Sequence, residues 1–517
     1  MKHAGNIFQR LIAFLVRHEW LVVVLFGVFV LRIPTLFDPH WYGDEEIYLV
    51  MGQGLRKGLV FYRDIFDHKP PVIYLLAAIV QTVFWFRILL MAVHAVSVVL
   101  FARLSELFFK NRRTMMAATG IYAVFSTLPL LEGTIANGEN FMTVPAILAM
   151  YLLYKAVIST KKTAGWTYWW VGFWFAIAFL VKVPIGFDFV AAGLFWWLYA
   201  IKDQSFWGSV RRLFSAPLLL MLLGFFVPVL LSVWYYALVG AFEPYVRSVL
   251  LQNIGYINSW KGEPTSPLSN PLVWRMLVIA GFSLLALLIK KRSSVTRPML
   301  FVSLWLLFAT YGALLSNRPY PHYLLQPLIP AVFLAGLLID KVLSLRRSGD
   351  LFLGISSLVL SGVMLANVGF DYYPTVSYYR NFIDYIRGAK STEQFEAYFP
   401  SALFRNKKVA DYLRTRTAPT ERVFIWGEEP AIYDMADRLP VGRYMVSFHI
   451  RDFPNGYAET YQALVTAKPK YILVIPGKVP DFPALNTLLQ IDYLEVTRID
   501  DVIVYMYIEP KLVLNQL

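Results

Sequence analysis

The fold is decided by residues 21–37, LVVVLFGVFVLRIPTLF, an apolar run long enough to cross a membrane as a helix. The chain then becomes polar and carries the acidic triplet DEE (residues 44–46) and the segment DHKPP (residues 67–71), before a second apolar run begins at Val72. Charged groups held this close to hydrocarbon cost free energy unless they meet a partner or line a wet cavity. We therefore expect the segment between the two apolar runs to carry the chemistry of the protein.

The composition is that of an integral membrane protein. Apolar residues make up 57% of the 517 residues and charged residues only 16%, whereas a soluble domain carries about 25% charged residues. The formal net charge of +14 comes from lysines and arginines that lie mainly in short segments between apolar runs, as topology signals do, so it does not indicate nucleic-acid binding. The absence of cysteine excludes disulfides, thiolate catalysis and cysteine-ligated zinc, and it fits a bacterial or archaeal envelope protein.

Clusters of lysine and arginine recur between the apolar runs, and placing them on the cytoplasmic side gives a consistent alternation of spans. About eleven membrane-spanning helices are then predicted, at residues 21–37, 88–109, 114–131, 141–158, 166–181, 189–201, 213–238, 272–289, 298–315, 324–340 and 351–370. The run from Val72 to Phe86 is short for a crossing, and counting it would invert every later loop, so we expect it to stay in the outer half of the membrane. The first run lacks a small-residue cleavage site, so we expect it to be retained and not removed as a signal peptide.

This topology places five loops outside the membrane, at about residues 38–86, 132–140, 182–188, 239–271 and 316–323. The acidic triplet and most other candidate residues then face the same side. We expect the transmembrane domain to occupy residues 1–370, with residues 38–86 as its first outer loop, in a multi-pass protein of the plasma membrane.

Beyond residue 370 the sequence contains no further span and mixes charges with short β-type runs. Strands are predicted at residues 422–426, 471–475 and 502–508, and helical patterns at 407–415 and 459–467. Strands alternating with helices predict an α/β domain. We therefore expect residues 371–517 to form an extracytoplasmic α/β domain.

Asp44 is the strongest candidate for a catalytic residue. A partly desolvated carboxylate near the lipid–water boundary can act as a general base toward a hydroxyl acceptor. Glu45 or Glu46 could orient it, share a proton with it or bind a metal. The alternative is an N-cap and acidic first turn for the helix that follows; we favour function for Asp44 and the cap for Glu46.

His68 and Lys69 place two cationic or hydrogen-bonding groups directly before a helix that prolines initiate. A lysine here is suited to hold a phosphate as a point charge. The alternative is a lysine that extends its ammonium to the membrane surface. Its position beside the carboxylates, and not on the cytoplasmic side, favours the phosphate.

Glu139 and Asn140 follow the turn signal Asn137-Gly138 in the second outer loop. The turn could present both side chains to a sugar or a metal, and a solvated loop acid is an equal alternative. Metal binding has little other support, because the sequence has no HExxH motif and no pair of histidines at helical spacing. We expect no required cofactor and no metal ligand, although a divalent ion remains open.

Lys182 lies at the outer end of a span, and Arg318, His322 and Tyr323 lie in the fifth outer loop. Each could be an interface anchor, whereas together they predict a surface that binds an anion such as a donor phosphate. No Walker A or GxGxxG motif is present, so a nucleotide site is unsupported. A transferase that works outside the membrane then needs a donor that arrives through it, which a lipid-linked phosphate would satisfy.

Asp44-Glu45 in combination with Asp67-His68-Lys69-Pro70-Pro71 resembles the multispan glycosyltransferases with the C-type fold (GT-C). The resemblance covers about residues 20–340 and is closest to the protein O-mannosyltransferases and the lipid A aminoarabinose transferases. It implies a polyprenyl-phosphate-linked sugar as donor, Asp44 as catalytic base with Glu45 as its neighbour, and Lys69 near the donor phosphate.

Two later segments extend the resemblance, and one departs from it. Lys182-Val-Pro resembles a lysine-containing motif at the outer end of a later span, and residues 318–323 resemble a loop of the late spans that bears Arg, His and Tyr. Glu139 takes the place of an acid in the second loop, but as Asn-Gly-Glu and not as paired acids.

The leading hypothesis is an inverting, metal-independent glycosyltransferase that moves a sugar from a polyprenyl-phosphate donor to a hydroxyl of a protein, lipid or glycan at the outer face. The second is a transporter or flippase of a lipid-linked or anionic substrate, which predicts inverted repeats and ionisable groups near the bilayer midplane. Here the charges gather at one boundary, and we find no repeated halves. The third is a lipid-binding scaffold, which would tolerate neutralising Asp44 and Lys69 together.

Overall fold

The computed structural model describes residues 9, 19–160, 163–200, 206–251, 270–292, 295–344, 348–366, 368–477 and 479–508. The contacts divide the chain into two compact units. Unit 1 comprises Met1–Leu36, Arg87–Ser232 and Ile254–Val376, and unit 2 comprises Phe37–Phe86, Val233–Asn253 and Ser377–Leu517. This division differs from a single boundary at residue 370, because residues 37–86 pack with the C-terminal part of the chain.

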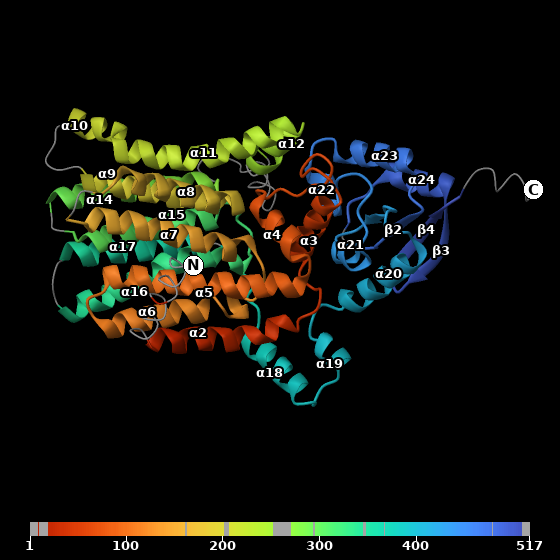
Figure 1. The fold of residues 1–517 in the computed structure, drawn as a ribbon, viewed down its shortest axis with the longest axis horizontal. Helices are drawn as coiled ribbons and strands as arrows, with labels where there is room; N and C mark the ends of the chain where they lie inside the picture. Colours follow the sequence, from red (N-terminus) through yellow and green to blue (C-terminus); the bar gives the residue numbers. More distant parts are fainter. Residues whose placement is uncertain are drawn as a thin grey trace, which may run out of the picture. The chain divides into compact units, whose positions relative to one another are not determined.

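Unit 1 is a bundle of helices that run alongside one another (Figure 1). Its longer helices are α2 (Glu19–Arg32), α5 (Val83–Phe108), α6 (Arg112–Phe125), α7 (Gly138–Ile158), α8 (Gly165–Val181), α9 (Gly186–Ala200), α11 (Ala216–Leu238), α14 (Pro271–Arg292), α15 (Arg297–Ala313), α16 (Leu325–Ser344) and α17 (Ser348–Ala366). Short helices join them: α10 (Phe206–Arg211) and the 3-10 turns η1 (Ile33–Leu36), η2 (Pro129–Leu131), η3 (Val183–Ile185), η4 (Arg212–Phe214) and η7 (Pro321–Leu324). The first residues of α5 and the last of α11 belong to unit 2.

Each of the eleven predicted spans corresponds to a helix in the described residues. Eight are long and apolar enough to cross a membrane. The other three are α6, α8 and α15, which have 14, 17 and 17 residues. The chain is therefore a polytopic membrane protein, with eight helices that satisfy both criteria within the described ranges.

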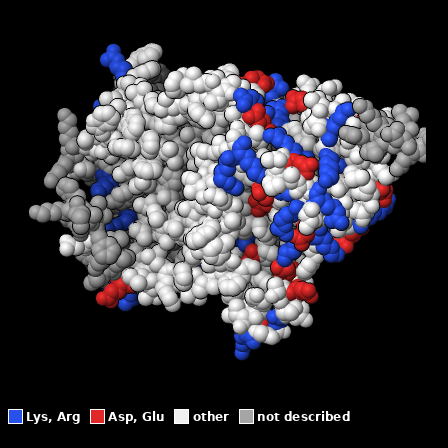
Figure 2. Space-filling view, turned by 45° about the vertical axis from the view of Figure 1, so that its right-hand side comes forward, with Lys and Arg blue, Asp and Glu red and all other residues white. Residues whose placement is uncertain are grey.

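The outer face of α11 shows why these helices need a membrane. Large apolar side chains are exposed along it, namely Leu219, Leu223, Phe226, Leu230 and Trp234. Their spacing of three or four residues keeps them on one side of the helix. Charged side chains are also sparse over the helices of unit 1 in Figure 2. Such a surface is stable against lipid and would aggregate in water.

Helices α8 and α11 approach each other through two glycines. A Cβ atom added at Gly172 would overlap the backbone of Met221, and one added at Gly224 would overlap the backbone of Trp169. Small residues let membrane helices pack backbone to backbone, which is where much of their association energy arises.

We expect Gly172→Ala to force these helices apart and to destabilise the protein by about 1–3 kcal/mol, as overpacking does. The measurement is the thermal unfolding midpoint in detergent. Gly281→Ala in α14 is the matched control, because an added Cβ there meets nothing within 4 Å. Equal midpoints for the two variants would contradict the close packing of α8 on α11.

The segment Val72–Val80 forms a separate helix, α4, that ends at Gln81 in the left-handed conformation with a φ of 69°. Nine helical residues extend only about 14 Å, whereas the hydrocarbon core is about 30 Å thick. The sequence prediction that residues 72–86 do not form a full span is therefore confirmed for residues 72–80, whereas residues 83–86 begin the spanning helix α5.

Unit 2 contains α3 (Gly43–Arg56), α4, α12 (Phe242–Val246), the π-helical turn η5 (Arg247–Leu251) and a C-terminal α/β part. The helices of that part are α18 (Thr375–Ile386), α19 (Thr392–Glu396), α20 (Ala402–Arg416), α21 (Ala431–Ala436), α22 (Ser447–Asp452), α23 (Gly456–Ala467) and α24 (Pro483–Asp492). The first two residues of α18 belong to unit 1. Its strands are β1 (Phe424–Trp426), β2 (Tyr471–Val474), β3 (Tyr493–Ile499) and β4 (Val502–Tyr507).

The strands form one mixed sheet in the order β1-β2-β4-β3. Strand β1 pairs with β2 in parallel, and β4 pairs antiparallel with both β2 and β3. Strands β1, β2 and β4 lie where the sequence predicts them. Strand β3 was missed because it is an edge strand with mostly exposed or half-buried residues, so it lacks an apolar run.

The loop before α4 enters the core of this α/β part. Phe66 is fully buried in a cluster that includes Phe424, Tyr444 and Phe453. Its backbone N–H donates to the carbonyl of Arg443 at 2.9 Å. An anchor of this kind fixes the residues that follow directly in the chain, which are 67–69.

Candidate functional site

Helix α3 carries the acidic triplet in its first turn, but neither Asp44 nor Glu46 caps it. The N-cap is Tyr42. Asp44 instead accepts a hydrogen bond from the hydroxyl of Tyr48 at 3.3 Å, one turn along the helix. The cap interpretation of Glu46 is wrong, because its carboxylate is buried beside His40 with 3.1 Å between Oε1 and Nδ1. Acids in this turn still interact favourably with the positive end of the helix dipole.

Lys69 brings the two polar segments together. Its Nζ lies 3.4 Å from Oδ2 of Asp44 and 3.6 Å from Oδ2 of Asp67, and only 7% of its side chain is exposed. The ammonium also lies 4.8 Å from the centre of the Tyr48 ring, a cation–π contact. The predicted neighbourhood of Asp44 and Lys69 is thus present within unit 2.

Two buried tyrosines hold the backbone of Lys69. The hydroxyl of Tyr62 donates to the Lys69 carbonyl at 2.9 Å. The Lys69 N–H donates to the hydroxyl of Tyr74 at 2.9 Å, and this hydroxyl in turn donates to Oδ2 of Asp67 at 2.8 Å. The lysine is therefore fixed at both of its peptide groups, which limits where its ammonium can lie.

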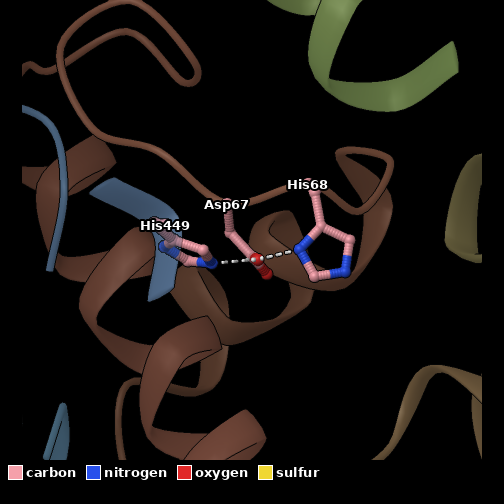
Figure 3. Close-up of side chains that lie close together, drawn as sticks. All are labelled: Asp67, His68 and His449. Atoms are coloured by element: carbon pink, nitrogen blue, oxygen red, sulfur yellow. Dashed lines mark ion pairs between the residues drawn. The ribbon is translucent and has the colours of Figure 1, made fainter. Parts of the chain in front are cut away.

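Asp67 is fully buried between two imidazoles (Figure 3). Its Oδ1 lies 2.9 Å from Nδ1 of His68 and 3.2 Å from Nε2 of His449. Burial by itself raises the pKa of Asp67, but the charges of Lys69 and His68 and the contacts with both histidines outweigh it and hold the pKa well below its usual range. Asp67 is therefore ionised at neutral pH. Burial lowers the pKa of His449, and the hydrogen bond and charge of Asp67, which raise it, offset this only in part.

We expect Asp67→Asn to destabilise the protein by about 3–5 kcal/mol, because it removes the charge from a buried ionic group. A lowered folded-state pKa means that the stabilisation is present above the unfolded pKa of about 3.9 and is lost as the pH falls through the folded value. The difference from wild type should thus be full at pH 7 and shrink in acid.

Thermal unfolding of the two proteins at a series of pH values measures this effect. Asp500→Asn is the control, because Asp500 forms an exposed pair with Lys408 and such pairs contribute only about 0–1 kcal/mol. A pH-independent difference for Asp67→Asn would contradict the ionisation of Asp67.

A second polar cluster lies within unit 1. Lys182, the C-cap of α8, forms an ion pair with Glu139 in the first turn of α7. His322 lies between two acids, with Nδ1 2.7 Å from Oε2 of Glu132 and Nε2 3.7 Å from Oε1 of Glu139. The ammonium of Lys182 also lies 4.9 Å from the centre of the Tyr323 ring. The structure thus gives Lys182 and His322 carboxylate partners of their own.

The remaining predicted site residues, Asn140, Arg318 and Glu45, lie outside the ion pairs described above. Asn140 donates from its amide to the carbonyls of Ile135 at 2.9 Å and Glu132 at 3.4 Å, so it fastens its own loop. Arg318 is half-buried between α15 and η7 in unit 1. Glu45 is fully buried in α3.

Several residues of these clusters were not predicted as site residues. Asp67 and Glu132 were visible as charges beside apolar runs, so the sequence contained a signal for them. Tyr62 and Tyr74 are indistinguishable from packing aromatics in the sequence. His449 is 382 positions from Asp67, as the numbering shows, and only the fold brings them together.

Two groups in unit 2 have the composition to hold a metal ion. They are Asp67 with His68 and His449, and His40 with Glu46 and Asp434. In each group the potential ligand atoms lie within 4.8 Å of one another. The two groups differ in their cationic neighbours. The Lys69 ammonium lies beside the Asp67 carboxylate in the first group, whereas Glu46 and Asp434 in the second group face the His40 imidazole.

In a comparison with known proteins, the chain is distantly similar to proteins that share one name. No family model matches the chain. The chain is 25% identical over 375 residues to the undecaprenyl phosphate-alpha-4-amino-4-deoxy-L-arabinose arabinosyl transferase of Pseudomonas paraeruginosa (strain DSM 24068 / PA7), covering 67% of this chain and 65% of that protein. It is 25% identical over 374 residues to the protein of the same name from Pseudomonas aeruginosa (strain LESB58), covering 66% and 64%. The chain thus spans slightly less than two thirds of the length of these relatives.

Proposed function

We propose that this protein is a membrane glycosyltransferase that takes a sugar from a polyprenyl-phosphate donor. Three observations support the proposal: the polytopic helical fold, the distant similarity to arabinosyl transferases named for an undecaprenyl phosphate sugar, and the pairing of Asp44 with Lys69. The acceptor is a hydroxyl group at the outer face of the membrane, where we place the C-terminal α/β part.

The observation that carries the chemistry is the contact of 3.4 Å between Asp44 and Lys69. It places a carboxylate that is 30% exposed beside an ammonium that is almost completely buried. An exposed base can meet an acceptor, and a fixed cation in a low-dielectric setting can stabilise negative charge on a leaving group.

The reaction exchanges one carbon–oxygen bond for another. The acceptor oxygen attacks the anomeric carbon of the donor from the face opposite the phosphate, and the bond from that carbon to the phosphate oxygen breaks. Asp44 accepts the proton of the acceptor hydroxyl, and the polyprenyl phosphate leaves with the electron pair. Inversion at the anomeric carbon follows from attack on the opposite face.

Lys69 stabilises the leaving phosphate in this proposal, with His68 beside it. The donor phosphate then competes with Asp44 for the ammonium, so donor binding frees the carboxylate to act as a base. The phosphate-binding roles predicted for Lys182, Arg318, His322 and Tyr323, and the sugar-binding roles of Glu139 and Asn140, stay predictions. In the reaction no metal is needed, and Glu45 supports Asp44 from the same helical turn.

The test is transfer by the purified protein in proteoliposomes that contain undecaprenyl phosphate carrying a radiolabelled sugar, with aminoarabinose as the first sugar tried. Hydroxyl acceptors are supplied as a lipid, a peptide and a glycan fraction. Formation of a labelled product together with free undecaprenyl phosphate supports the proposal. Movement of the labelled donor across the bilayer without any product would favour a flippase instead.

A further inference from the structure

The group formed by His40, Glu46 and Asp434 has more hydrogen-bond acceptors than donors. The Nδ1 atom of His40 lies 3.1 Å from Oε1 of Glu46, 3.2 Å from Oε2 of Glu46 and 3.4 Å from Oδ2 of Asp434. A ring nitrogen carries at most one hydrogen. One donor therefore faces three carboxylate oxygens.

Burial makes this deficit costly. Glu46 is 1% exposed, and its Oε1 has no hydrogen-bond partner among the described residues. Within the same described part of the chain, no lysine or arginine nitrogen lies within 4 Å of either carboxylate, whereas Lys69 faces Asp67 in the neighbouring histidine cluster. Two carboxylates this close to each other and this poorly compensated are stabilised by a cation that binds between them, either a proton or a metal ion.

The distances suit a small divalent ion. Zinc bonds to imidazole nitrogen and carboxylate oxygen are about 2.0–2.2 Å long, and the edges of a tetrahedron of such bonds are about 3.3–3.6 Å long. The 3.4 Å between His40 and Asp434 falls in this range, and the 3.1 Å between His40 and Glu46 is slightly shorter. Zinc binds to sets of ligands that consist of one imidazole and two carboxylates.

We propose that His40, Glu46 and Asp434 bind a zinc ion, with Nδ1 and one oxygen from each acid as ligands. The ion joins α3 to α21, two elements of unit 2 that are almost 400 positions apart in the sequence. A second link lies near the C-terminal ends of the two helices, where Gln53 and Lys57, the C-cap of α3, contact Asp437, the C-cap of α21. The zinc ion thus holds in place the helix whose first turn carries Asp44.

The first experiment measures zinc in the protein directly. Full-length protein with a tag free of histidine is purified in detergent, stripped with a chelator, dialysed against zinc and assayed by mass spectrometry of the metal. We expect one zinc per chain for the wild type. Glu46→Gln and Asp434→Asn should each weaken zinc binding by roughly a hundredfold or more. Mutation of a residue that only hydrogen-bonds to a metal ligand weakens binding by about 10-fold to 100-fold, so a larger loss indicates a direct ligand.

His449→Gln is the matched control, because it removes a ligand from the other histidine-containing group and leaves His40, Glu46 and Asp434 intact. It should retain one zinc. Loss of zinc in His449→Gln with full binding in Glu46→Gln would overturn the proposal, as would a wild-type protein that binds none. Calcium and manganese serve as comparison ions, and a preference for calcium would also contradict an imidazole ligand.

His40→Ala keeps the test decisive if the buried acid variants fail to fold, because the His40 side chain is 33% exposed and its loss leaves no cavity in the core. Zinc-edge X-ray absorption of the loaded wild type should show oxygen and nitrogen neighbours near 2.0–2.2 Å, and His40→Ala should lose the bound ion. Unchanged zinc content in His40→Ala would refute the assignment. None of these readouts depends on enzyme activity, so they stand apart from the proposed transferase reaction.

Discussion

Asp44→Asn should reduce sugar transfer by about a hundredfold to ten-thousandfold, which is the usual contribution of a general base. Asparagine keeps the shape of the side chain and can still accept the hydrogen bond from Tyr48, so the fold should be preserved. It cannot take the proton of the acceptor hydroxyl. The expected signature is a lower kcat with donor binding retained.

The measurement is the rate of product formation in proteoliposomes, together with binding of the labelled donor. Asp64→Asn is the control, because Asp64 lies in the same loop and its carboxylate pairs with Arg63. It should transfer sugar at the wild-type rate. Near wild-type turnover by Asp44→Asn would remove Asp44 from the mechanism.

Lys69→Met should have a comparably large effect through a different step. It removes the ammonium that contacts Asp44 and Asp67 and that we place at the donor phosphate. A hydrogen bond to a charged group contributes about 1.5–3 kcal/mol, so donor affinity should fall by roughly 10-fold to 150-fold. The leaving phosphate also loses its stabilising charge, which should lower kcat.

Donor titrations that report Kd and kcat separately check this prediction. Lys57→Met is the control, because Lys57 pairs with Asp437 at an exposed position of the same unit. A lipid-binding scaffold would tolerate the double variant Asp44→Asn with Lys69→Met, whereas a transferase would lose activity. Unchanged donor affinity in Lys69→Met would mean that its ammonium serves only to balance the two acids.

The membrane-spanning architecture could be read from the sequence because hydrocarbon imposes a length and a polarity on every segment that crosses it. The runs at residues 88–109 and 213–238 became α5 and α11 with ends shifted by at most five residues. The brevity of Val72–Val80 was readable for the same reason. The sequence was less informative about helix capping. The acids of α3 are residue types that suit an N-cap, but they lie in the first turn of the helix, and the N-cap is Tyr42.

The sequence by itself determined that the protein spans a membrane and that Asp44 and Lys69 are ionisable groups between two apolar runs. Only the tertiary structure decided what surrounds them. It brought His449 to Asp67 and Asp434 to Glu46 across almost 400 residues, and no local pattern encodes such pairs. Helix length and span depend on neighbouring residues and their solvent, whereas the partner of a buried charge depends on how distant segments pack.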